Sequence, residues 1–214
     1  MIRIESAQKV KLAVTVFALS ASALVGCGSD PGGETGDSGS TATLDTAAKI
    51  EGFIEGKPLV MEGADIPSHP NGYLQDANLG QATQCYHRVE MNLTGTTFHV
   101  KSALGTLNGA PNAGDVGTCD HASMSNELEF NSTSYLVENV TGDAECFDFT
   151  ISYTGFGQEG RGRITEDQTG VELELYFRDK AAGITCADGA PGSGGVQLDG
   201  KPFEGDAVQV YRLQ

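Results

Sequence analysis

The sequence predicts an all-β domain, an antiparallel β-sandwich or barrel of about ten strands with two disulfides. Apolar and polar residues alternate in several segments, which is the pattern of half-buried strands. Gly accounts for 29 of 214 residues, about twice the usual frequency of ~7%. No segment keeps a 3.6-residue apolar period long enough to predict a helix.

The alternation is clearest in residues 146–155 and 170–179, where every second side chain is aromatic or aliphatic. Successive side chains of a strand point to opposite faces, so one face of each segment would be buried and the other solvated. On this pattern Leu173 and Leu175 are expected inside, whereas Glu172 and Glu174 are expected on the solvated face.

Short polar stretches between the strands predict turns. The stretch Thr165–Gly170 ends in Gly and is expected to join two strands as a hairpin, and residues 93–97 and 130–135 are expected to do the same. Two longer stretches, Gly105–Asn126 and Ala187–Gly195, are predicted as loops. Loops beyond about 12–15 residues are uncommon and often functional.

The N-terminal residues predict export. Basic residues in the first eleven positions precede a largely apolar run, Leu12–Gly26. This run is short for a membrane span, which needs about 20 residues, and fits a secretory signal peptide. The motif that follows, Leu24-Val25-Gly26-Cys27, resembles the lipobox of bacterial lipoproteins. The resemblance covers about the first thirty residues, and the folded domain resembles no family.

The lipobox resemblance implies that Cys27 is lipidated. In bacterial lipoproteins this cysteine receives a diacylglyceryl group, the signal peptide is cut off before it, and the new amino group is acylated. The residues after it, Gly28 and Ser29, favour the outer membrane over the inner one in Gram-negative bacteria. The implied cofactor is therefore a covalent lipid, and the implied partner is a membrane, reached from the periplasmic face or the cell surface.

The chain divides into three parts on this interpretation. Residues 1–26 form the cleaved signal peptide. Residues 27–46 comprise the lipidated Cys27 and a tether rich in Gly, Ser and Asp, which has too few apolar side chains to fold. Residues 47–214 form a single β domain. The net charge of −16 repels nucleic acid, so no nucleic-acid partner is expected.

Four cysteines remain in the exported domain, and an even number in an oxidising compartment predicts two disulfides. Three pairings are possible. We favour Cys85–Cys119 with Cys146–Cys186, because each pair encloses one block of neighbouring strands and the two do not cross. Each closed loop would stabilise the fold by about 3–4 kcal/mol in the chain-entropy model.

A repeated Cys-x-His spacing is the strongest hint of a metal site. A Cys85–Cys119 disulfide would bring His87, Asp120 and His121 into one neighbourhood, where they could hold a divalent metal such as zinc or copper. The cysteines themselves are expected in the disulfide rather than as thiolate ligands, because the compartment is oxidising.

No catalytic residue is predicted, since the sequence contains no H-E-x-x-H, G-x-S-x-G or P-loop motif. The sequence favours a membrane-anchored exported lipoprotein with a non-catalytic β domain that binds a protein or small ligand or serves in the cell envelope. The alternative is an exported enzyme or metal-binding protein that uses the loop around Cys119, Asp120 and His121. A closed barrel with an apolar lumen would favour a carrier of a lipid or small ligand, and a filled sandwich would favour a protein-binding or structural role.

Overall fold

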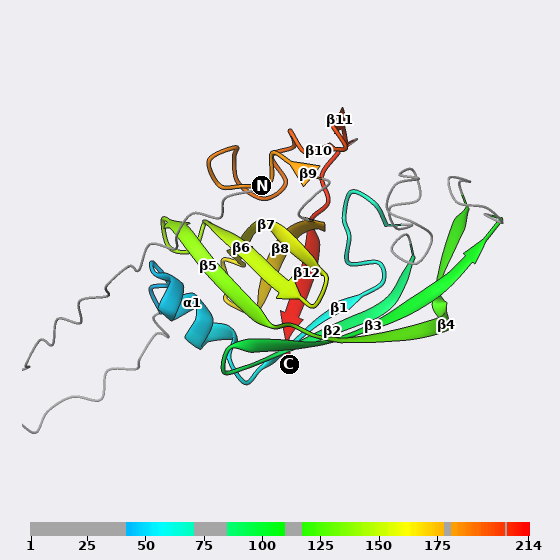
Figure 1. The fold of residues 1–214 in the computed structure, drawn as a ribbon, viewed down its shortest axis with the longest axis horizontal. Coiled ribbons are helices and arrows are strands. Elements are labelled where there is room, and N and C mark those ends of the chain that lie inside the picture. Colours follow the sequence, from blue (N-terminus) through cyan, green and yellow to red (C-terminus); the bar gives the residue numbers. More distant parts are fainter. Residues whose placement is uncertain (1–41, 71–84, 110–116, 178–180, 204) are drawn as a thin grey trace, which may run out of the picture. The chain divides into compact units, whose positions relative to one another are not determined.

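The computed structural model describes residues 42–70, 85–109, 117–177, 181–203 and 205–214 (Figure 1). The lipobox, Cys27 and most of the predicted tether lie outside these ranges. Described contacts begin inside the predicted tether, at Ala42, whose carbonyl accepts a hydrogen bond from the Gln168 side chain at 2.6 Å. Leu44 follows, which is buried and whose N–H donates to the Asp143 carboxylate. No helix in the described residues is long and apolar enough to cross a membrane.

One helix, α1 (Ala47–Ile54), precedes the strands. Thr46 caps its N-terminus, and the threonine hydroxyl accepts a hydrogen bond from the backbone N–H of Lys49. Its buried side chains, Ile50 and Ile54, lie one turn apart on the face that packs against the sheet edge β5 (Ser134–Thr141). The expectation of β structure throughout is wrong here, because two helical turns are too short to show a period.

Nine antiparallel strands form the main sheet, which confirms the predicted fold class. Their order across the sheet is β4-β3-β2-β1-β12-β8-β7-β6-β5, and the strands in the described part of the chain do not close into a barrel. A second sheet has three short strands, in the order β11-β10-β9. Besides β5, the strands are β1 (Pro58–Glu62), β2 (Tyr86–Thr94), β3 (Thr97–Asn108), β4 (Thr118–Asn131), β6 (Cys146–Tyr153), β7 (Phe156–Ile164), β8 (Gly170–Phe177), β9 (Ala181–Ala182), β10 (Gln197–Leu198), β11 (Lys201–Pro202) and β12 (Gln209–Leu213).

The stretch 130–135 is not a hairpin, which corrects the sequence expectation. It joins β4 to β5, and these two strands are opposite edges of the sheet (Figure 1). In the link, the N–H of Ser132 donates to the carbonyl of Phe98 in β3, at 2.8 Å, and the N–H of Thr133 donates to the carbonyl of Ser152 in β6, at 2.7 Å. The sheet therefore curls until its two ends face each other.

This curl lets a single sheet supply both walls of the core. Phe98 of β3 meets Tyr135 of β5 edge to face, with ring centroids 5.3 Å apart, and Phe149 of β6 at 5.7 Å. The predicted inward residues of β6 and β8 are buried, among them Ile151 and Leu173. Burial of each such side chain stabilises the fold by about 1.5–3 kcal/mol.

Both predicted disulfides are present. Cys85 is bonded to Cys119 and Cys146 to Cys186, with Cα–Cα distances of 5.3 and 5.9 Å. The turns at 93–97 and Thr165–Gly170 are also confirmed, since they join β2 to β3 and β7 to β8.

The predicted loop Gly105–Asn126 is instead largely strand. β3 continues to Asn108 and β4 begins at Thr118. These two residues form the last pair between the two strands. Most side chains in the first ten residues of β4 are exposed. A strand that is polar on both faces shows no alternation, which is why the sequence did not reveal it. The stretch Ala187–Gly195 is irregular, as predicted.

Candidate functional site

An apolar cavity of about 290 Å³ lies between the two halves of the curled sheet. One wall comes from β2, β3 and β4 and the other from β6, β7, β8 and β12. Side chains two residues apart on one strand share a face, and this spacing brings them into the cavity. The aliphatic part of the lining includes Val89, Met91, Val100, Leu104 and Leu175.

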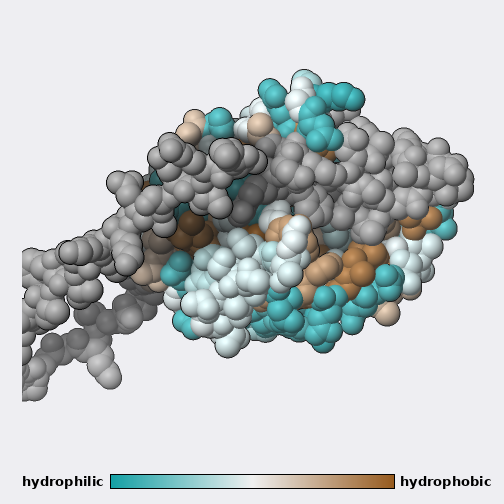
Figure 2. Space-filling model, in the orientation of Figure 1, coloured by the Kyte–Doolittle hydropathy of each residue, from teal (hydrophilic) through white to brown (hydrophobic). Residues whose placement is uncertain are grey.

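An aromatic cluster, formed by Phe130, Tyr153 and Phe156, lines part of the cavity. Tyr153 and Phe156 are stacked, with centroids 4.5 Å apart and rings 15° from parallel. Phe130 of β4 lies 5.9 Å from Phe156 and 6.1 Å from Tyr153, both edge to face. Phe156 is 39% exposed, so the cluster reaches the surface. Figure 2 shows hydrophobic residues reaching the surface beside hydrophilic ones.

The polar groups in the lining are uncharged. They include Ser102, Gln158 and Gln209, together with tyrosine hydroxyls. The Tyr211 hydroxyl donates to Oε1 of Gln209, at 2.7 Å. Burial raises the pKa of Tyr86 to about 12 and raises that of Tyr211 well above the ordinary value. These tyrosines are therefore neutral at physiological pH.

The predicted histidine neighbourhood exists, but three of its four imidazole nitrogens lie within hydrogen-bond distance of backbone carbonyl oxygens. Nδ1 of His87 lies 2.6 Å from the carbonyl oxygen of His121. In His121, Nδ1 lies 2.6 Å from the carbonyl of Tyr86, and Nε2 lies 2.5 Å from that of Pro70. A ring nitrogen that donates an N–H to a carbonyl oxygen offers no lone pair to a metal while that hydrogen bond is kept.

The three predicted metal ligands do not meet at one point. Within the described residues, the one group of three potential ligands is Cys85, Cys119 and His121, and both of its sulfurs are joined in the disulfide. The Asp120 carboxylate instead bonds to residues that follow it in β4. Hydrogen bonds from the Ser123 side chain and the Ala122 N–H lower its pKa. A metal at His121 would have to displace the backbone carbonyls.

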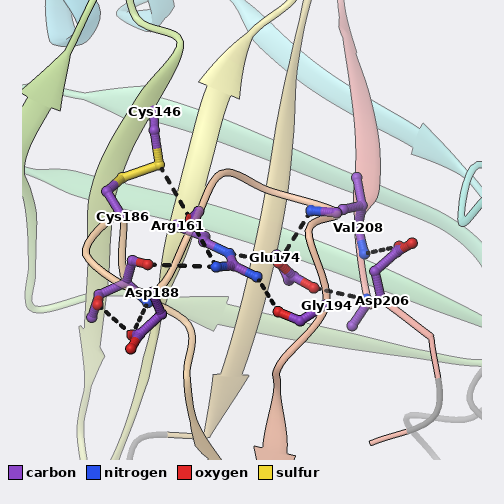
Figure 3. A network of polar contacts seen from close by, with 12 residues as sticks. Cys146, Arg161, Glu174, Cys186, Asp188, Gly194, Asp206 and Val208 are labelled. Atoms are coloured by element: carbon purple, nitrogen blue, oxygen red, sulfur yellow. Dashed lines mark hydrogen bonds and ion pairs between the residues drawn. A yellow bond between two sulfur atoms is a disulfide. The ribbon is translucent and has the colours of Figure 1, made fainter.

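A buried ion pair lies on the other face of the sheet, between Arg161 of β7 and Glu174 of β8 (Figure 3). Both side chains are fully buried, and Nε of Arg161 lies 2.8 Å from Oε2 of Glu174. Arg161 also donates to the carbonyls of Gly189, at 2.7 Å, and Gly194, at 3.0 Å. The N–H of Ala207 donates to the other oxygen of Glu174.

The expectation that Glu174 is solvated is therefore wrong. The irregular stretch between β9 and β10, residues 183–196, supplies the carbonyls that Arg161 binds, and Ala207 supplies an N–H to Glu174. One sequence signal was available, because Arg161 stands between Gly160 and Gly162. A Cβ on Gly160 would lie 2.0 Å from the carbonyl oxygen of Glu174, so only glycine allows this close approach of β7 to β8.

A second hollow, of about 650 Å³, has a charged lining that includes Glu145 and Glu166. Its other charged groups have protein partners. Arg163 pairs with Glu172 at 2.5 Å, and the Asp143 carboxylate accepts the N–H of Leu44. The apolar cavity is therefore the better candidate for a ligand site.

The chain was compared with protein-family models, with curated proteins and with solved structures, and nothing matched in any of the three comparisons.

Proposed function

We propose that this protein is an exported, lipid-anchored binding protein whose β domain holds a small apolar ligand between the two halves of its sheet. The observation that carries the proposal is the cavity of about 290 Å³ with its largely aliphatic and aromatic lining. Ligand sites are concave and mostly apolar with a few polar groups, and their volumes begin near ~300 Å³.

Binding accounts for the lining better than catalysis does. The described lining residues offer hydroxyls, amides and hydrocarbon, but no pair of groups that could act as general acid and base. The disulfides support an exported protein, because such bonds persist in oxidising compartments. A lipid on Cys27 would hold the cavity near a membrane, where apolar molecules are abundant.

Replacing Cys27 with Ala is expected to move the protein from the membrane fraction to the soluble fraction. Two acyl chains give stable anchoring, at about 0.8 kcal/mol per buried CH₂, and the variant would carry none. Fractionation of cells followed by immunoblotting measures this, with Ser29→Ala as the control that keeps the cysteine. A Cys27→Ala protein that stays with the membrane would contradict the anchoring mechanism.

Filling the cavity is expected to abolish ligand binding. The neutral dye N-phenyl-1-naphthylamine, which fluoresces in apolar surroundings, is the probe. Val100 faces the cavity from β3, and Val100→Trp should weaken dye binding at least about tenfold, equivalent to ~1.4 kcal/mol. Lys101→Trp adds the same ring at the next, exposed position and is expected to bind the dye normally. Equal binding by both variants, or no binding by the unaltered protein, would refute the proposal.

A further inference from the structure

The strands that line the cavity also carry charged residues, but these charged side chains do not line the cavity. In β2 and β3, Val89, Met91 and Val100 line the cavity, whereas Lys101 is exposed beside them and pairs in register with Glu90. None of the described lining residues is Asp, Glu, Lys, Arg or His. The chain as a whole, by contrast, carries a net charge of −16.

A ligand with a charged end would lose its hydration in this cavity and find no counter-ion. Burying an unpaired charge costs several kcal/mol. The raised pKa values of the cavity tyrosines reflect the same property, because a phenolate is disfavoured there for the same reason. An anion would in addition be repelled by the net negative charge of the chain.

The lining does offer neutral hydrogen-bonding groups. Ser102 is 8% exposed, and it lines the cavity. A hydroxyl both donates and accepts, so it can pair with the hydroxyl or ester of a ligand. Aliphatic and aromatic side chains surround this group and suit a hydrocarbon chain.

From this arrangement we infer that the ligand is an uncharged amphiphile, a hydrocarbon chain ending in a hydroxyl or ester rather than in a carboxylate or an ammonium. The inference rests on the proposed function, since it specifies the ligand of the same cavity. It excludes free fatty acids and alkylamines as ligands at neutral pH.

Competition among three compounds with the same chain tests the inference. The protein loaded with N-phenyl-1-naphthylamine is titrated at neutral pH with decanol, decanoate and decylammonium. Decanol is expected to displace the dye with an apparent Kd at least about tenfold lower than that of either ion. Displacement by decanoate or decylammonium at the decanol concentration, or no displacement by decanol, overturns the inference and leaves the proposed function standing. Absence of dye binding overturns both.

A charge placed in the cavity should reverse this preference. Leu128 of β4 lines the cavity and is half-buried, so Leu128→Lys would supply a cation to the lining. This variant is expected to bind decanoate more tightly than the unaltered protein does. Asn131→Lys adds the same charge at an exposed position of β4 and is expected to leave decanoate binding unchanged. An equal gain in decanoate affinity in both variants would mean that decanoate binds at the surface, and this result would overturn the inference. If Leu128→Lys does not fold, the competition in the unaltered protein still decides.

Discussion

Replacing Arg161 with Met is expected to destabilise the domain by about 3–5 kcal/mol. The substitution leaves the Glu174 carboxylate fully buried without its cation. It also removes the donors to the carbonyls of Gly189 and Gly194. An unpaired buried charge costs far more than the loss of an average contact, and this explains the large expected effect.

The neighbouring pair provides a matched control. Arg163 lies two residues along β7 and pairs with Glu172, but its side chain is 41% exposed. Arg163→Met is expected to cost about 0–1 kcal/mol, because water screens the exposed pair. Denaturant unfolding followed by circular dichroism measures both variants. Equal losses in the two would show that burial of the ion pair has no special energetic weight.

Removing both charges should cost less than removing one. The double variant Arg161→Met with Glu174→Leu leaves no buried charge, and replacing both partners of such a pair with apolar groups is often close to neutral. Recovery is expected to be partial, since the carbonyls of Gly189 and Gly194 still lose their donors. A double variant less stable than Arg161→Met would contradict this account.

Removing the Cys146–Cys186 disulfide is the second change with a large expected effect. The cysteines are 40 residues apart, and the chain-entropy model gives a loss of about 4 kcal/mol for a loop of this length. Cys186 lies in the segment that supplies the carbonyl of Gly189 to Arg161. Replacing both cysteines with Ala should therefore also increase amide hydrogen exchange across residues 185–194.

The other disulfide separates the global effect from the local one. Cys85 and Cys119 are 34 residues apart, so replacing both with Ala should cost nearly the same overall stability. It ties together residues beside β2 and β4 and makes no contact with the 185–194 segment, so the exchange there is expected to rise only in step with global unfolding. Local exchange that rises equally in both variants would contradict the role of Cys186 in holding that segment.

The site was less predictable than the fold. The doubled Cys-x-His spacing correctly indicated that His87 and His121 lie near the Cys85–Cys119 disulfide. It could not show that backbone carbonyl oxygens lie within hydrogen-bond distance of three of their imidazole nitrogens, because those carbonyls come from other strands and loops. The cavity had no sequence signature, since its lining is drawn from seven strands and each contributes only one to three side chains.

The sequence by itself determined the β class and two of the three turns, since alternation and turn residues act over short distances. It favoured, among three possible pairings, the two disulfides that the structure has. Export and lipidation of Cys27 remain predictions. Only the tertiary structure decided that residues 130–135 cross between sheet edges, that Glu174 is buried, and that the curled sheet encloses an apolar cavity. The physical reason is that alternation shows which side chains share a face, whereas the elements that cover each face are set by pairings between residues far apart in the chain.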